Sequence, residues 1–293
     1  MNNAIKTHKK LKFASTSGPK NWVGDGFNVH TMFRPDPALD PYISPFLLMD
    51  YGPPKEFSPT NQRRGVGSHP HRGFETVTFA YQGEVEHKDS TGGGGVIQAG
   101  DVQWMTAGGG VVHSEFHSDH FSASGGVMEM VQLWVNLPKK DKMTAPKYQA
   151  VTAKQIPTVQ VGDGLSLRVI AGAYGETAGP CSTFTPINVY DLTSEKKTEV
   201  SLGFTSGSNT LVLVLRGELE FEGTSYPQQS LLIFEQEGEE VRFTADDQFK
   251  GLVLNGDPIN EPVYAHGPFV MNTKQEIIEA IDDFQAGKMG VID

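Results

Sequence analysis

Two stretches of this 293-residue chain repeat one another, and a repeated run of strand-like sequence restricts the fold more than any other feature. Residues 210–220, TLVLVLRGELE, match residues 76–86, TVTFAYQGEVE, so that Gly217 falls on Gly83. Both copies are rich in β-branched and aromatic residues and are interrupted at a glycine, as antiparallel strands are at a turn. Two copies of one β unit predict a duplicated barrel.

The sequence around each copy continues the strand pattern. In the first half, short apolar runs end at Gly83, at the glycine runs 92–95 and 108–110, and at Pro138. Strands spaced by roughly 8 to 12 residues with turn signals between them are typical of a β-sandwich or barrel. The chain also carries 33 glycines and 18 prolines, which favours many short strands over helices. We therefore predict an all-β protein.

The length accommodates two domains of roughly 140 residues each. Residues 138–150 are rich in lysine and proline and poor in apolar residues, so we interpret them as a linker between domains at 1–137 and 151–293. One helix is predicted near the C-terminus. Thr273 and Glu276 form a capping box ahead of the apolar positions Ile277, Ile281 and Phe284, and Gly287 ends the helix.

Two pairs of metal-binding side chains lie next to glycine-rich turns in this β context. His69 and His71 are two residues apart, and side chains at that spacing project from the same face of a strand. His113 and Glu115 repeat the spacing with a carboxylate as the second member. Imidazole and carboxylate together suit a first-row divalent metal such as iron, manganese, nickel, copper or zinc. The sequence therefore predicts one metal held by His69, His71, His113 and Glu115.

Other side chains are alternatives to these ligands. Glu75 would share the face of His71 on an unbroken strand, and His117 is in phase with His113. His117 and His120 are interpreted as loop or rim residues that could approach a substrate. His87 follows the turn at Gly83 and is expected at the surface.

The repeat indicates where a second metal site would lie. Counting from the matched glycines, the positions of His69 and His71 fall on Gly203 and Thr205. The positions of His113 and Glu115 fall near Arg242 and Thr244. None of these is a good ligand for such a metal. We therefore expect a C-terminal barrel without a metal site.

Charge and cysteine content restrict the partners and the compartment. A net charge of −11 and the absence of a basic stripe argue against direct nucleic-acid binding. Cys181 is the single cysteine, so no disulfide can form within the chain. Neither a secretory signal nor an apolar stretch long enough for a transmembrane helix is present. We expect a cytoplasmic protein with no membrane association.

Three segments resemble signatures of the pirin family, in the cupin superfamily. They are residues 69–78, HPHRGFETVT; residues 100–115, GDVQWMTAGGGVVHSE; and residues 260–272, NEPVYAHGPFVMN. Thr106 replaces the proline usual in the second cupin motif, and the fourth ligand moves from the Glu75 position to Glu115, which is itself a pirin trait. The resemblance implies two tandem cupin barrels of the jelly-roll type. It also implies Fe(II) on His69, His71, His113 and Glu115 in the N-terminal barrel only.

The family resemblance also implies a function. The pirin family includes enzymes that cleave flavonols such as quercetin with dioxygen. We therefore expect a quercetin 2,3-dioxygenase-type oxygenase in which Glu115 acts as general base. Some pirins look like redox-sensing regulatory proteins, in which the iron oxidation state alters binding to a transcription factor or a metabolic enzyme. The acidic chain suits such a protein partner better than DNA. A metal-bearing fold with no relevant turnover is the third alternative.

Overall fold

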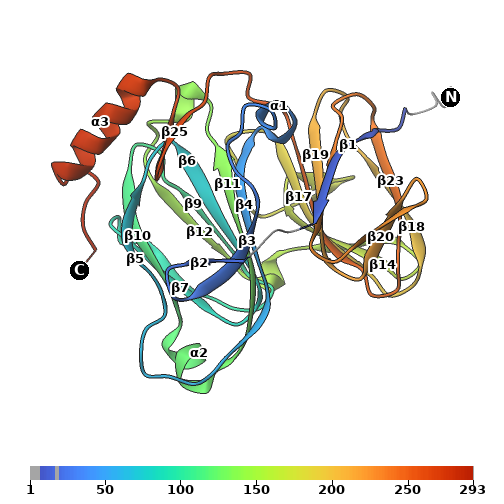
Figure 1. The fold of residues 1–293 in the computed structure, drawn as a ribbon, viewed down its shortest axis with the longest axis horizontal. Coiled ribbons are helices and arrows are strands. Elements are labelled where there is room, and N and C mark those ends of the chain that lie inside the picture. Colours follow the sequence, from blue (N-terminus) through green and yellow to red (C-terminus); the bar gives the residue numbers. More distant parts are fainter. Residues whose placement is uncertain (1–6, 17–19, 293) are drawn as a thin grey trace. The chain divides into compact units, whose positions relative to one another are not determined.

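The structure, a computed structural model, describes residues 7–16 and 20–292. These residues form two compact units, each built from three segments of the chain. The histidine unit comprises residues 20–35, 46–155 and 259–292, and the second unit comprises residues 7–16, 36–45 and 156–258. Both units consist mainly of antiparallel strands, which confirms the all-β prediction (Figure 1).

The histidine unit contains a seven-stranded and a four-stranded sheet. The larger sheet has the order β12 (Lys147–Val151), β9 (Val102–Thr106), β6 (Phe74–Gln82), β11 (Gly126–Asn136), β4 (Phe46–Phe57), β3 (Phe27–Phe33) and β2 (Asn21–Val23). The smaller sheet has the order β5 (Gly65–His71), β10 (Val111–His117), β7 (Val85–Asp89) and β8 (Gly94–Ile97). The remaining elements are α2 (Asp119–Ser124), η1 (Lys139–Asp141), η2 (Ala153–Gln155), β25 (Tyr264–His266), β26 (Phe269–Met271) and α3 (Lys274–Gln285).

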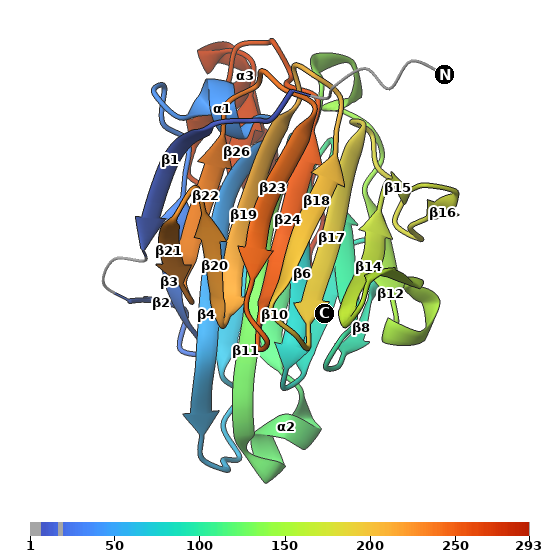
Figure 2. The ribbon, with the colours of Figure 1, turned by 90° about the vertical axis from the view of Figure 1, so that its right-hand side faces the viewer.

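The second unit repeats this plan (Figure 2). Its larger sheet has the order β1 (Leu11–Thr16), β22 (Ser230–Phe234), β19 (Asn209–Arg216), β24 (Lys250–Gly256), β17 (Ile187–Ser194), β14 (Leu165–Ala171) and β13 (Thr158–Gly162). Its smaller sheet has the order β18 (Thr198–Gly203), β23 (Glu240–Ala245), β20 (Glu218–Phe221) and β21 (Thr224–Pro227). The remaining elements are α1 (Asp40–Ile43), β15 (Ala173–Tyr174) and β16 (Thr177–Ala178).

The two strand orders correspond position by position. β6, β9 and β11 of the histidine unit take the places of β19, β22 and β24 in the second unit. Gly83 and Gly217 both adopt a positive φ, 82° and 67°, at the turn that leaves the first strand of the repeat. The sequence repeat is therefore a structural duplication of a cupin-like fold, as predicted.

One edge strand of each large sheet, β12 in the histidine unit and β1 in the second unit, comes from outside the repeated segment. β12 pairs with β9, and β1 pairs with β22. Each addition satisfies backbone N–H and C=O groups that an open edge would leave unpaired. The predicted division at 1–137, 138–150 and 151–293 differs from this arrangement, because β1 belongs to the second unit and part of the expected linker forms β12.

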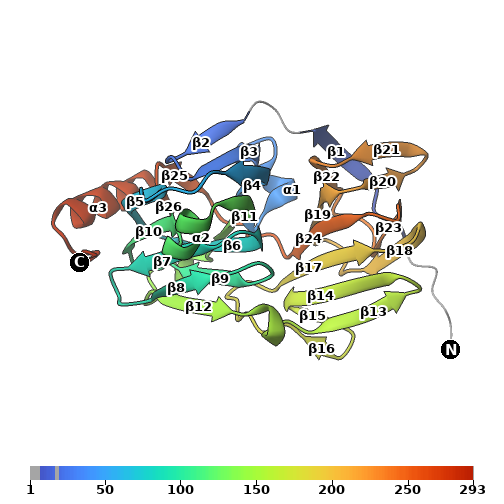
Figure 3. The ribbon, with the colours of Figure 1, turned by 90° about the horizontal axis from the view of Figure 1, so that it is seen from below.

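The C-terminal helix α3 belongs to the histidine unit, where it lies along β25 and β26 (Figure 3). Its start is as predicted, because the Thr273 side chain accepts a hydrogen bond from the backbone N–H of Glu276. Ile277 and Ala280 are the buried positions of the helix, whereas Phe284 is 40% exposed. None of the helices in the described part of the chain is long and apolar enough to cross a membrane.

Candidate metal centre

Strands β5 and β10 bring the two predicted ligand pairs together. They pair antiparallel with His69 opposite His113, and the register shifts between His113 and Glu115. The ring centroids of His69 and His113 lie 4.3 Å apart, those of His69 and His71 4.9 Å, and those of His71 and His113 4.8 Å. One ligand nitrogen from each ring lies within 4.8 Å of the others, so one ion can be reached by all three histidines.

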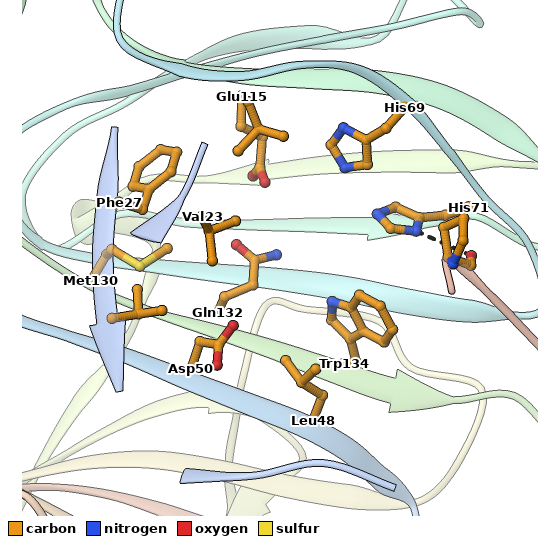
Figure 4. Close-up of a pocket in the computed structure, with 13 residues that line it drawn as sticks. Val23, Phe27, Leu48, Asp50, His69, His71, Glu115, Met130, Gln132 and Trp134 are labelled. Carbon is orange, nitrogen blue, oxygen red and sulfur yellow. Dashed lines mark hydrogen bonds between the residues drawn. The ribbon is translucent and has the colours of Figure 1, made fainter. Parts of the chain in front are cut away.

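Hydrogen bonds to backbone carbonyls orient two of these rings. His69 Nδ1 lies 2.8 Å from the carbonyl oxygen of Gly67, and His71 Nδ1 lies 3.2 Å from that of Pro268 (Figure 4). A carbonyl only accepts, so each Nδ1 carries a proton and Nε2 is the nitrogen of each ring that can bind a metal. His113 Nε2 is fully buried and has no hydrogen-bond partner among the described residues. Buried polar nitrogens are rarely left without a partner, so the unpaired Nε2 of His113 beside two further imidazoles fits a role as a metal ligand.

Burial keeps two of the rings in the neutral form that binds metals. Burial first, and the neighbouring His69 second, lower the pKa of His71 to about 3. Burial and the neighbouring histidines also hold the pKa of His113 well below its ordinary value. Both imidazoles are therefore neutral near pH 7, and a proton does not compete with a metal for their lone pairs.

Glu115 lies at the same site, within a hydrogen-bond network. Its Oε1 accepts hydrogen bonds from Gln103 Nε2 at 2.5 Å and from Thr78 Oγ1 at 3.0 Å. Its carboxylate forms a second group of potential ligands with His113 and His87, so the two groups share His113. Glu115 is thus grouped with His113 and with a fifth candidate, His87, whereas His69 and His71 belong to the first group only.

The prediction that His87 lies at the surface is wrong. Its side chain is completely buried, and its ring stacks on Tyr148 with centroids 4.7 Å apart and an interplanar angle of 14°. The alternation along β7 could have predicted this burial. Val85, His87 and Asp89 are buried, whereas Glu86 and Lys88 face outward. Burial alone would raise the pKa of Asp89, but hydrogen bonds from His87 and Thr91 lower it to about 2.

Glu75 lies away from the site because the chain bends after His71. Gly73, with φ +88°, separates β5 from β6, and a Cβ at this position would lie 2.0 Å from the carbonyl oxygen of Val270. The Glu75 carboxylate accepts a hydrogen bond from Thr106 Oγ1 at 2.6 Å, on the face of β6 opposite to Thr78. Burial raises the pKa of Glu75 to about 7.

His117 and His120 have structural roles. His117 Nε2 lies 2.9 Å from the carbonyl oxygen of Gly26, and its ring contacts Phe27, Phe57 and Phe121. His120 is exposed and pairs with Glu84 at 3.1 Å. Neither belongs to a group of potential metal ligands among the described residues.

A cavity of about 280 Å³ opens onto His69, His71 and Glu115. Figure 4 shows Phe27, Met130 and Trp134 around it, and the Trp134 ring lies 5.3 Å from that of His71. The side chains on its walls are mostly apolar, and this is the character of a small-molecule site.

Two polar side chains face the cavity on the side away from the histidines (Figure 4). The Asp50 carboxylate accepts a hydrogen bond from Thr31 Oγ1 at 2.6 Å, and burial raises its pKa. Gln132 Oε1 lies 3.0 Å from Thr78 Oγ1, the hydroxyl that also reaches Glu115. These groups can accept or donate hydrogen bonds to hydroxyls of a ligand bound in an otherwise apolar space.

The C-terminal segment holds the site from one side. In addition to the Pro268 carbonyl, it supplies Asp283, whose carboxylate pairs with Arg72 Nη1 at 3.0 Å. The ammonium of Lys142 is buried and donates to the carbonyl oxygens of Gly73 and Val270 and to Asn136 Oδ1. The third signature segment, residues 260–272, therefore positions His71 and the turn that follows it.

The residues present fit a divalent transition metal. Three imidazole nitrogens converge, that of His113 has no hydrogen-bond partner among the described residues, and the Glu115 carboxylate lies beside His113. In the second unit, the strand pairing places Leu202, Val241 and Phe243 at the positions of His69, His113 and Glu115. The sequence alignment to Gly203, Arg242 and Thr244 was therefore wrong by one residue.

The residues at those positions are apolar and belong to the core of the second unit. An apolar interior offers no ligand for a divalent metal, which supports a metal site in the histidine unit alone.

Two family models match the chain. One, described as pirin, matches residues 26–135, and the other, described as the pirin C-terminal cupin domain, matches residues 189–290. A Pseudomonas aeruginosa protein named "Putative quercetin 2,3-dioxygenase PA2418" is 47% identical over 96% of this chain and 98% of its own length. A tomato (Solanum lycopersicum) "Pirin-like protein" is 40% identical over 85% of this chain and 82% of its own.

Solved structures give the same result. A crystal structure titled quercetin 2,3-dioxygenase from Acinetobacter baumannii superposes with a TM-score of 0.93 at 52% identity, covering 98% of this chain and all of that one. A bacterial pirin from Escherichia coli, solved in complex with nickel(II), has a TM-score of 0.65 and covers 84% of this chain and all of that one. At 18% identity, the second likeness concerns the fold alone.

Proposed function

Because this chain belongs to the pirin family, we propose that it is a non-haem iron oxygenase of the quercetin 2,3-dioxygenase type, acting on a flavonol-like aromatic compound and dioxygen. The observation that supports the proposal is the mostly apolar cavity onto which His69, His71 and Glu115 open, with the buried His113 grouped with the two histidines. The names of the Pseudomonas and Acinetobacter relatives support the same reaction class.

In the proposed site, His69, His71, His113 and Glu115 hold one divalent metal, most simply Fe(II). The metal would supply Lewis-acid positioning of an oxygen substituent and the redox chemistry that dioxygen requires. Backbone carbonyls engage Nδ1 of His69 and of His71, so Nε2 of each ring would be the atom that binds the metal. Gln103 and Thr78 hold Glu115 in position from the barrel interior.

The remaining residues bind and orient the substrate. A flat aromatic ring fits between the apolar walls that include Phe27 and Trp134, and Asp50 and Gln132 are placed to bond its hydroxyls. Glu115 would act as the general base that takes the proton of the enol hydroxyl. The apolar walls exclude water, which strengthens these interactions.

Oxygen uptake tests the proposal. Protein purified without an affinity tag and loaded anaerobically with ferrous iron should consume dioxygen in proportion to the loss of quercetin absorbance. Glu115→Gln keeps the size of the side chain but removes the base, and general-base catalysis contributes roughly 10²–10⁴-fold, so kcat should fall by that order. If metal-replete protein shows no oxygen uptake with any flavonol or related enol, the oxygenase proposal is wrong.

A further inference from the structure

A chain of hydrogen bonds leads from the candidate metal centre to a carboxylate on the neighbouring strand. His113 Nδ1 lies 3.4 Å from His87 Nδ1, and His87 Nε2 lies 3.2 Å from Asp89 Oδ2. Both histidine rings are completely buried. The β7–β10 pairing places Asp89 opposite His113 and His87 opposite Glu115, so the three groups come from two adjacent strands.

The two ends of this chain allow only one arrangement of protons. At the outer end, an ionised carboxylate only accepts, so His87 Nε2 donates to Asp89 Oδ2 and Nδ1 is the atom that faces His113. At the inner end, His113 can bind a metal through Nε2 only if its own proton lies on Nδ1. That proton then points at His87 Nδ1.

The surroundings hold Asp89 and His87 in place. Asp89 Oδ1 accepts hydrogen bonds from the backbone N–H groups of Thr91 and Gly93 and from Thr91 Oγ1, at 2.8, 3.0 and 2.6 Å. Its other oxygen, Oδ2, faces His87. Stacking on Tyr148 fixes the plane of the His87 ring. The hydroxyl of Tyr148 lies 3.4 Å from Gln103, the amide that donates to Glu115.

We propose that Asp89 and His87 are positioning residues of the metal centre: Asp89, acting through His87, holds His113 in the Nδ1–H tautomer that offers Nε2 to the metal. The role resembles the carboxylate–histidine–metal arrangement of other metal sites, extended here by one further histidine. This inference rests on the proposed metal site and does not require that the protein be an oxygenase.

Asp89→Asn is a sharp test because the surroundings determine how the new amide is oriented. The position of Oδ1 accepts two backbone N–H groups, so the asparagine carbonyl oxygen must take that place. The NH₂ group then faces His87 Nε2 and donates to it. His87 must move its proton to Nδ1, which forces the proton of His113 onto Nε2. Loss of a group that orients a metal ligand costs about 10–100-fold in metal affinity, so we expect Ni(II) to bind that much more weakly.

The same substitution in a His87→Phe variant separates control of the His113 tautomer from support of the loop at residues 90–93. In His87→Phe the connection between residues 89 and 113 is absent, so adding Asp89→Asn should change Ni(II) affinity by less than about twofold. If Asp89 acted only by holding residues 90–93, the loss would be equal in both backgrounds. Asp163→Asn, which removes a carboxylate of an exposed ion pair with Lys196, serves as the matched control and should leave the affinity unchanged.

The tautomers can be observed directly in the metal-free protein. Two-bond ¹H–¹⁵N spectra of histidine-labelled protein should show His113 as Nδ1–H in the parent and as Nε2–H in Asp89→Asn. The proposal is overturned if His113 stays Nδ1–H and nickel affinity stays within about twofold, or if the losses are equal with and without His87. Neither measurement involves turnover, so failure of this proposal is distinguishable from failure of the proposed oxygenase activity.

Discussion

At the scale of single residues, the candidate site depends on which nitrogen of each histidine carries the proton. Gly67 and Pro268 engage the Nδ1 atoms of His69 and His71, and His87 faces the Nδ1 of His113. Each of the three Nε2 atoms is left for a metal. Spacing of two residues on a strand predicts that the side chains share a face, but it cannot predict these partners, which come from segments distant in the sequence.

Glu75 gives a prediction about pH at the same scale. Its pKa is about 7 in the folded protein against an ordinary value of 4.5, so the folded state holds the proton more tightly. The associated stability is complete below pH 4.5 and is lost as the pH rises through 7, by up to about 3 kcal/mol. Glu75→Gln does not titrate. Urea unfolding of metal-free protein at pH 5 and pH 8 should therefore show a fall of about 1–3 kcal/mol in the parent relative to the variant.

Comparison with the variant cancels the contribution of the buried histidines. His71 and His113 have lowered pKa values, so they change stability in the opposite direction and equally in both proteins. Glu199→Gln, at an exposed position, should behave like the parent. A parent and a Glu75→Gln variant with the same dependence on pH would show that Glu75 is ionised in the folded protein.

The alternative ligands show where reasoning from residues alone fails. A two-residue period predicts that Glu75 shares the face of His71, but the chain bends between them at Gly73, which has a positive φ. The sequence predicts His87 at the surface, yet the pairing of β7 with β10 buries it completely. Both outcomes depend on tertiary pairing, which a single sequence specifies only weakly.

At the scale of elements, the C-terminal segment is part of the site. It passes next to β5 and β6, where Pro268 contacts His71 and Asp283 pairs with Arg72. Val112 of β10 packs with Phe269, Met271 and Ile277 in one apolar cluster. The helix was predicted from its capping residues, but its place in the histidine unit was not, because packing of this kind leaves no periodic signal.

Lys142 provides a stability test of this arrangement. Its buried ammonium donates to Gly73 and Val270 carbonyls and to Asn136, and burial lowers its pKa to about 8. Lys142→Met fills a similar volume but removes a hydrogen bond from each of three buried acceptors, so the free energy of unfolding should fall by about 2–4 kcal/mol. Lys140→Met, in the same turn but exposed, should change it by less than about 0.5 kcal/mol.

Urea denaturation of both lysine variants measures this difference. Equal stabilities of the two variants would contradict the anchoring role assigned to Lys142. A change in the m-value would instead indicate that the C-terminal segment has detached in the folded state.

Strand positions were largely predictable, whereas register was not. The repeat placed β6 on β19 correctly because both are long apolar strands that end at a glycine. The positions that would bear ligands in the second unit were displaced by one residue. A one-residue error exchanges the two faces of a strand, and so Arg242 and Thr244 were named where Val241 and Phe243 lie.

At the scale of the whole molecule, duplication has given two units with different interiors. One contains the candidate metal centre and its cavity, and the other contains an apolar core at the corresponding positions. The duplication was evident from the sequence. The exchange of the terminal segments was not, because β1 and the strands β25 and β26 are short and join units whose other strands are distant in the sequence.

Net charge predicts how the molecule behaves toward nucleic acid. With a net charge of −11 the chain repels a phosphate backbone. The protein should therefore not change the electrophoretic mobility of duplex DNA, even at about 50 mM salt. Retarded DNA at that ionic strength would reveal a local basic surface that opposes the overall charge.

The most direct test of the metal centre is metal content per chain. Tag-free protein loaded anaerobically with ferrous iron should contain about one iron per chain by elemental analysis, and His69→Ala/His113→Ala should contain none. Circular dichroism of the double variant should show that its strands remain folded. About one iron in the parent and none in the variant is the result that this account predicts. No metal in the loaded parent, or equal metal in both proteins, would contradict it.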